Sequence, residues 1–179
     1  GDYNWTQVCH GGLAAGALAV YERDPQLARQ VIRRAVAAMP KVMAASYRGN
    51  GAYPEGVGYW AYGTNYNTLL IEMLENAFGT GFGLTDYPGL EESGEFVRAC
   101  ILPSGHKFAC SDTGRESRVG LNYANVYLMV RRGKSGLFDR YMRNFLADYT
   151  AARPQKHHPA DQRLAAPMLP LLARLPEQA

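Results

Sequence analysis

Helical periodicity is the feature that most limits what this chain can fold into. Apolar side chains recur at roughly helical spacing in residues 6–21, and in residues 26–47 they gather on one face, with arginines elsewhere. A third run of this kind covers residues 59–81, and strand-like alternation is scarce. The positions that carry the pattern are Val8, Leu13, Ala17 and Val20 in the first run, and Leu27, Val31, Ile32, Ala35 and Val36 in the second. We therefore expect an all-α protein whose helices pack as antiparallel hairpins.

Local signals predict where these helices begin and end. Asp24 followed by Pro25 is typical of an N-cap with proline at the first helical position, and Pro40 predicts a kink. The third helix is expected to end near Gly79 or Gly81. The remaining chain predicts a turn-rich loop at 48–58, a short helix at about 89–100, a short strand or extended loop at 106–112, and helices at 121–132 and 137–149.

The composition of the chain changes near residue 150. The last part holds five of the ten prolines, which interrupt a final short helical stretch. We expect a helical domain over residues 1–150 and a proline-rich C-terminal tail over residues 151–179. No apolar run approaches the roughly 18–20 residues that cross a bilayer, so no membrane span is expected. No signal peptide is visible in the opening residues.

Charges, cysteines and histidines identify no ligand. The balance of charge is −2 over residues 1–130 and +5 over residues 131–179, but the basic side chains are scattered and no stacking aromatics accompany them. We expect no nucleic-acid partner, although such a field could steer an anionic substrate. Cys9 is interpreted as a small buried residue, and a bridge between Cys100 and Cys110 stays open. The histidines lie far apart in the chain, so neither a metal nor another cofactor is expected.

Tyrosines are concentrated between residues 47 and 66, where five of the twelve lie. Tyr59, Tyr62 and Tyr66 fall on one face of the third predicted helix. Because every buried phenol needs a hydrogen-bond partner, three on one face are unusual for a plain core. Two interpretations stay open. The tyrosines line a boundary between helices, or they form a cleft wall that stacks sugar rings and offers a phenol for proton transfer.

A second polar group stands at the start of the first helix. Gln7 follows Asn4 at i+3, whereas His10 at i+6 lies only partly on the same side. Asn4 also suits an N-cap, and a lone histidine on a helix is more often structural than catalytic. Spacing alone therefore does not decide between a structural and a functional role.

Several segments of the chain resemble the heparinase II/III-like polysaccharide lyases, in consistent order over about residues 3–130. The segments are NWTQVCHGG, GALAVYERDPQLARQVIRRAV, GAYPEGVGYWAYGTNYN, GLTDYPG and FACSDTG. The resemblance implies the later part of an incomplete α/α toroid, in a longer parent chain with earlier helices and a β-sandwich. It also implies cleavage of acidic polysaccharides by β-elimination at uronic acids. Because relatives include many bacterial glycan-utilisation proteins, we expect a periplasmic or secreted protein.

β-Elimination sets three chemical requirements, for which the resemblance names residues. The sugar carboxylate must be neutralised by hydrogen bonds, and the resemblance places Asn4 there, with His10 as the weaker candidate. A base must then remove the C5 proton and an acid must protonate the leaving oxygen. The motif position assigns this proton transfer to Tyr59, with Tyr62 second. The histidine that the family usually contributes from the sandwich is absent from this chain.

Further residues are candidates for binding the glycan. Trp5 and Trp60 are either stacking surfaces or packing residues, and Glu55 either orients the loop or binds a sugar hydroxyl. In the cleft-wall interpretation, Tyr62 and Tyr66 also contact the glycan. An acidic oligosaccharide or polysaccharide is the expected ligand.

Two other functions remain open. One is a helical module that binds acidic glycans without cleaving them. The other is an α/α-toroid glycoside hydrolase, which needs two opposed carboxylates, and here Glu55 has no obvious partner apart from Asp112.

Overall fold

The computed structural model describes residues 4–104, 106–114 and 128. Within them the chain forms helices and no named strand, so the all-α expectation is confirmed for this part. The helices are α1 (Asn4–Ala19), α2 (Pro25–Ser46), α3 (Arg48–Gly51), α4 (Gly56–Phe78) and α5 (Ser93–Ala99). The helix predicted at 137–149 and the tail at 151–179 lie outside the described residues, and Leu128 is the one described residue of the helix predicted at 121–132.

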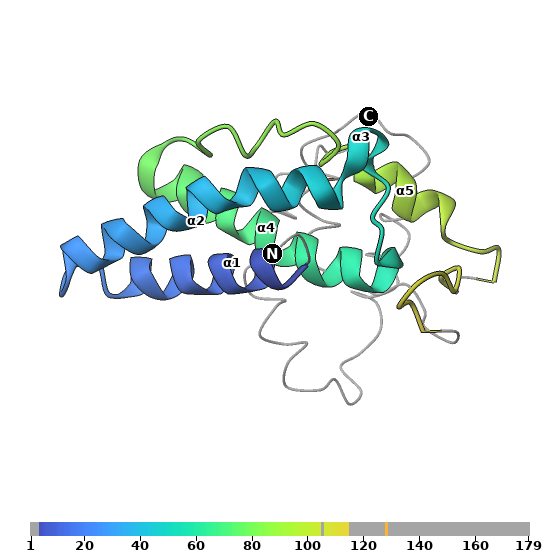
Figure 1. Ribbon diagram of the computed structural model, residues 1–179, viewed down its shortest axis with the longest axis horizontal. Helices are drawn as coiled ribbons and strands as arrows, with labels where there is room; N and C mark the ends of the chain where they lie inside the picture. The colour runs from blue at the N-terminus through green and yellow to red at the C-terminus, as the bar shows by residue number, and fades with distance from the viewer. Residues whose placement is uncertain (1–3, 105, 115–127, 129–179) are drawn as a thin grey trace, which may run out of the picture.

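Three long helices pack side by side (Figure 1). α1 and α2 form the antiparallel hairpin that the sequence predicts, and α4 packs along α1. α1 and α4 run in the same direction: Asn4 bonds to Glu55, just before α4, and Gly11 lies against Tyr66, further along both helices. The pairing of α1 with α4, which are separated in sequence by α2, is therefore parallel.

Capping residues explain most of the helix ends. The Asp24 side chain accepts a hydrogen bond from the Leu27 N–H at 3.0 Å, and Pro25 follows as the first helical residue. α2 continues through Pro40 to Ser46. At the end of α4, Gly79 adopts a left-handed conformation with φ of 72° and donates its N–H to the Glu75 carbonyl, as predicted.

α4 begins at Gly56, inside the segment that the sequence predicts as a loop. Its first turn is capped from a distance, because the Thr113 hydroxyl accepts a hydrogen bond from the Gly58 N–H at 3.2 Å. Gly56 has a φ of +84°, and a side chain there would meet the Cys110 carbonyl. Because Thr113 is so distant in sequence, no local signal marks this start.

The buried face of α1 consists of small and polar residues. The helix buries Asn4, Gln7, Gly11, Ala14 and Ala17. Leu13 is 61% exposed, and Val20 is exposed as well. Cys9 is also exposed, so its interpretation as a small buried residue is wrong. In α2, Ile32 and Ala35 are buried as predicted, whereas Leu27 is exposed. The reason in α1 is that small residues let a neighbouring helix approach closely, and the larger apolar side chains point away.

The core is built from residues of α1, α2, α4 and α5 and of the segment that follows α4. Its largest fully buried side chains are Trp60, Tyr47, Met39, Met43, Leu70, Ile71, Leu74, Leu84, Leu90 and Leu128. After α5, Ile101 and Lys107 form an isolated antiparallel bridge, so residues 106–112 follow the extended-loop alternative. None of the helices described is long and apolar enough to cross a bilayer.

A pair of adjacent glycines in α1 tests the contact with α4. A Cβ at Gly11 would lie 2.8 Å from the Tyr66 carbonyl oxygen, whereas one at Gly12 meets nothing within 4 Å. We expect Gly11→Ala to lower the free energy of unfolding by about 1–3 kcal/mol, because the backbone of α4 must move. Gly12→Ala should raise it by about 0.5–1 kcal/mol through helix propensity alone. Urea unfolding followed by circular dichroism measures both. Equal effects would contradict the close approach.

Candidate functional site at the N-terminal ends of α1 and α4

The N-terminal ends of α1 and α4 meet at one place, where segments distant in sequence converge. Asn4 Nδ2 donates a hydrogen bond to Glu55 Oε1 at 2.7 Å, and the Asn4 backbone N–H donates to Glu55 Oε2 at 3.2 Å. Glu55 thus accepts one of the N–H groups that a helix leaves without a partner at its first turn. The Thr113 hydroxyl accepts a hydrogen bond from the Gly58 N–H in the first turn of α4. The NWTQ, YPEGVGYW and ACSDTG segments therefore adjoin one another.

A buried chain of hydrogen bonds lies behind this junction. The Tyr53 hydroxyl donates to Gln7 Oε1 at 2.7 Å, and Gln7 Nε2 donates to the Tyr47 hydroxyl at 2.9 Å. The Tyr47 hydroxyl donates in turn to Thr64 Oγ1 at 3.1 Å. The two phenol rings meet edge to face, with centroids 5.9 Å apart. Gln7 of α1 therefore links the end of α2 to the loop before α4. Through Tyr47 it is also linked to α4.

Burial keeps both of these phenols protonated. It raises the pKa of Tyr47 well above the usual value, although hydrogen bonds to Thr64 and Gln7 oppose the shift. Burial also raises the pKa of Tyr53, and the charges of ionised Tyr47 and of Glu55 add to the increase. The two side chains therefore act in this network as neutral hydrogen-bonding groups. Tyr47 at the end of α2 and Tyr53 in the following loop share no helical face, so periodicity singles out neither of them.

Asn4 is buried, with 3% of its surface exposed. Its amide nitrogen faces Glu55, and its Oδ1 atom is buried without a hydrogen-bond partner in the part of the chain that the structure describes. In this arrangement the Asn4 amide is engaged by Glu55. Glu55 is half-buried and is held by Asn4, and both alternatives for its role stay predictions.

The three tyrosines of α4 lie along the boundary with α1. Tyr59 is half-buried against the core and stands one turn before Gly63, where Asn4 and Gln7 pack. Tyr66 lies against α1, and its ring meets that of Tyr62 edge to face with centroids 5.6 Å apart. Tyr62 is 42% exposed. The backbone of Tyr66 lies at a helix boundary and the Tyr62 phenol is partly exposed, whereas the cleft wall stays a prediction.

The two tryptophans occupy opposite environments. Trp5 is 67% exposed on α1. Trp60 is fully buried, and its Nε1 atom has no hydrogen-bond partner among the described residues. Trp60 therefore packs in the core, and a role as a stacking surface does not fit this arrangement.

His10 lies on a different side of α1 from Asn4. Six residues correspond to roughly 120° around a helix, so the two side chains do not converge. His10 Nδ1 is 2.9 Å from the Thr6 carbonyl oxygen. Because a carbonyl only accepts, Nδ1 carries the proton, and in the neutral ring Nε2 is left as an acceptor.

The described residues contain no group of three side chains that could hold a metal ion. Cys100 and Cys110 are free thiols, so the bridge that the sequence left open is not formed. Burial, together with the neighbouring Cys110, raises the pKa of the Cys100 thiol. Asp112 is exposed beside the start of α4.

No protein-family model matches this chain, and the comparison with curated proteins finds no match either.

Removal of the Tyr47 hydroxyl tests the buried network. Tyr47→Phe leaves Gln7 Nε2 without its acceptor inside the protein, so we expect the free energy of unfolding to fall by about 1–3 kcal/mol. The matched variant Tyr62→Phe alters a partly exposed phenol and should change it by less than about 0.5 kcal/mol. Urea denaturation of both variants gives the comparison. A Tyr47→Phe variant as stable as the parent would mean that the network contributes nothing.

The raised pKa values of Tyr47 and Tyr53 predict alkaline destabilisation. The unfolded chain loses these phenolic protons near pH 10, whereas the folded chain keeps them to higher pH. Folding therefore retains protons, and each phenol should lower the free energy of unfolding by about 1.4 kcal/mol per pH unit above about pH 10. Below about pH 10 the contribution of the two phenols to the free energy of unfolding is fully present. Urea unfolding between pH 8 and pH 11 measures the slope, which should be shallower in Tyr47→Phe. An equal slope in the variant would contradict the assignment.

Proposed function

We propose that this chain is part of the helical domain of a polysaccharide lyase that cleaves a uronate-containing acidic glycan by β-elimination. The observation that supports the proposal is the convergence at the N-terminal ends of α1 and α4. There the Asn4–Glu55 hydrogen bonds and the Gly58–Thr113 hydrogen bond join three of the segments that resemble the lyase family. Random packing of three helices gives no reason for these segments to meet.

Tyr59 is assigned the proton transfer. Its phenol stands in the first turns of α4, where the helix presents partial positive charge. That charge stabilises a phenolate when Tyr59 gives up its proton to the leaving oxygen, and a phenolate can accept the C5 proton.

Neutralisation of the sugar carboxylate is assigned to Asn4, through the amide hydrogen that Glu55 does not accept. The burial of Asn4 means that a sugar reaches this hydrogen only after the groups covering Asn4 have moved aside. Trp5 and Tyr62, both exposed, are assigned the stacking of neighbouring sugar rings. The proposal includes the toroid arrangement, a longer parent chain and a periplasmic or secreted location.

A glycan-binding module without catalysis is the second candidate. The observation that favours it is the pairing of Asn4 with Glu55, which leaves the carboxamide occupied and buried. The exposed aromatic side chains suffice for binding without turnover. A glycoside hydrolase gains no support, because Glu55 accepts two hydrogen bonds from Asn4 and is held in place.

The Tyr59→Phe variant of the full-length parent protein tests the proposal. Loss of the phenol should reduce formation of the unsaturated product, followed by its ultraviolet absorbance, by about 100-fold or more. Tyr87→Phe is the matched control, because the Tyr87 hydroxyl donates to the Pro40 carbonyl on α2 and lies outside the proposed site. Full activity of Tyr59→Phe would remove Tyr59 from catalysis. A parent protein that binds acidic oligosaccharides and forms no unsaturated product would establish the binding module instead.

A further inference from the structure

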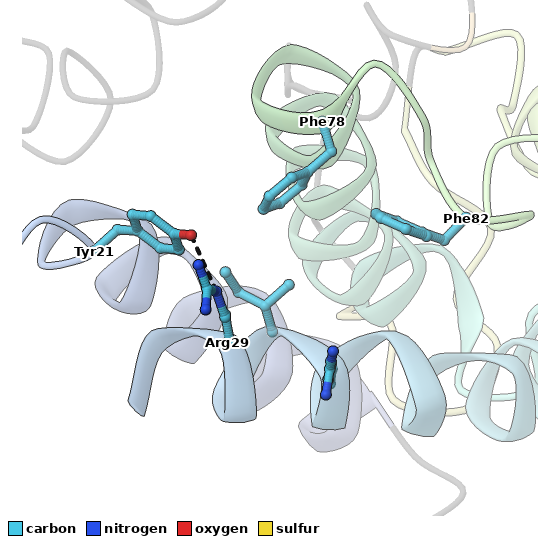
Figure 2. A pocket seen from close by; sticks show the side chains of 6 residues that line it. Tyr21, Arg29, Phe78 and Phe82 are labelled. Atoms are coloured by element: carbon cyan, nitrogen blue, oxygen red, sulfur yellow. Dashed lines mark hydrogen bonds between the residues drawn. The ribbon is translucent and has the colours of Figure 1, made fainter. Parts of the chain in front are cut away.

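A pocket of about 300 Å³ lies at the opposite end of α1 and α4 from the candidate site. It is lined by Tyr21, Arg29, Ile32, Arg33, Phe78 and Phe82 (Figure 2). These residues come from the segment after α1, from the first half of α2, from the last turn of α4 and from the segment that follows it. Its size is at the lower end of the range for small-molecule sites, roughly 300–1,000 Å³.

Apolar side chains form the floor and one wall of the pocket. Ile32 is buried, whereas Phe78 and Phe82 are exposed. The two phenylalanine rings meet edge to face, with centroids 5.9 Å apart. Figure 2 shows both rings across the hollow from Tyr21 and Arg29. The exposure of two adjacent phenyl rings costs hydrophobic free energy, which a flat apolar ligand would recover.

Two guanidinium groups form the opposite wall, and one of them is held in place. Arg29 Nε donates to the Tyr21 hydroxyl at 3.2 Å, and the guanidinium carbon lies 5.8 Å from the centroid of the Tyr21 ring. No acidic side chain lines the pocket. Within the described part of the chain, neither Arg29 nor Arg33 has an ion pair with a carboxylate. The nearby Asp24 carboxylate is engaged at the start of α2.

We propose that this pocket binds a small aromatic carboxylate. The flat ring would lie against Phe78, Phe82 and Ile32, and the carboxylate would accept hydrogen bonds from the two guanidinium groups, whose planar donors match its geometry. A sugar acid fits less well. Its hydroxyl groups need partners, and the one neutral polar group on the walls, the Tyr21 hydroxyl, already bonds to Arg29. The proposal is independent of the proposed function, because no residue is shared.

Binding of 2-naphthoate to the wild-type chain provides the first test. We expect saturable binding in calorimetry with a dissociation constant on the order of 0.1–1 mM, as suits a ligand of this size. The Ile32 methyl resonance should shift through the ring current of the ligand. The neutral 2-naphthamide should bind at least about tenfold more weakly, and glucuronate should not shift Ile32 at all. Equal binding of the amide, or a shift caused by glucuronate, would overturn the proposal, as would an unmoved Ile32 resonance at 5 mM naphthoate, about five times the weakest expected dissociation constant.

Variants of the walls provide the second test. Arg29→Gln and Arg33→Gln should each weaken 2-naphthoate binding about tenfold, because each removes a charged donor. Arg34→Gln is the matched control: it removes an exposed arginine from the same helix that does not line the pocket. Phe78→Leu keeps the site apolar and should weaken both naphthyl probes. Circular dichroism confirms folding of each variant. Equal losses in Arg33→Gln and Arg34→Gln would show general charge attraction and would overturn the assigned site.

Discussion

The close approach of α1 and α4 at two glycines is the contact on which the rest of the described structure depends. Gly11 lies against the backbone of Tyr66, and Gly63 leaves space for the side chains of Gln7 and Tyr53. Without this approach Gln7 could not reach Tyr47 and Tyr53 together. The buried hydrogen bonds then hold the loop before α4, and the held loop presents Glu55 to the start of α1.

Helical periodicity and capping signals predict most of the helices, but they do not predict which side of α1 is buried. In α2 the arginines mark the solvent face, and Ile32 and Ala35 are buried as expected. α1 has no charged residue between Asn4 and Ala19, so every side of it is weakly apolar. Packing distance decides the outcome there, and small residues at the contact leave Leu13 outside. The spacing of apolar residues in one sequence does not indicate how closely two helices pack.

The candidate site could be predicted only in part, for a related reason. Motif order places Asn4, Glu55 and Tyr59 together, and the first two do form a hydrogen-bonded pair. Motif order does not distinguish the buried Trp60 from the exposed Trp5, because both are tryptophans next to polar residues. Thr113 caps the start of α4 although it lies 55 residues further along the chain than Gly58. No local sequence pattern predicts such a distant contact.

The parallel orientation of α1 and α4 gives the two ends of the helix pair opposite electrostatic character. Both N-terminal ends, with their partial positive charge, lie at the junction of Asn4 with Glu55. A carboxylate there is stabilised by the helix ends, and so is an anionic group approaching from solvent. Both C-terminal ends point toward the Tyr21 and Phe78 pocket, where carbonyl groups contribute partial negative charge. The guanidinium groups of Arg29 and Arg33 offset that charge locally. Each end of the pair can therefore attract anions, by helix termini at one end and by side chains at the other.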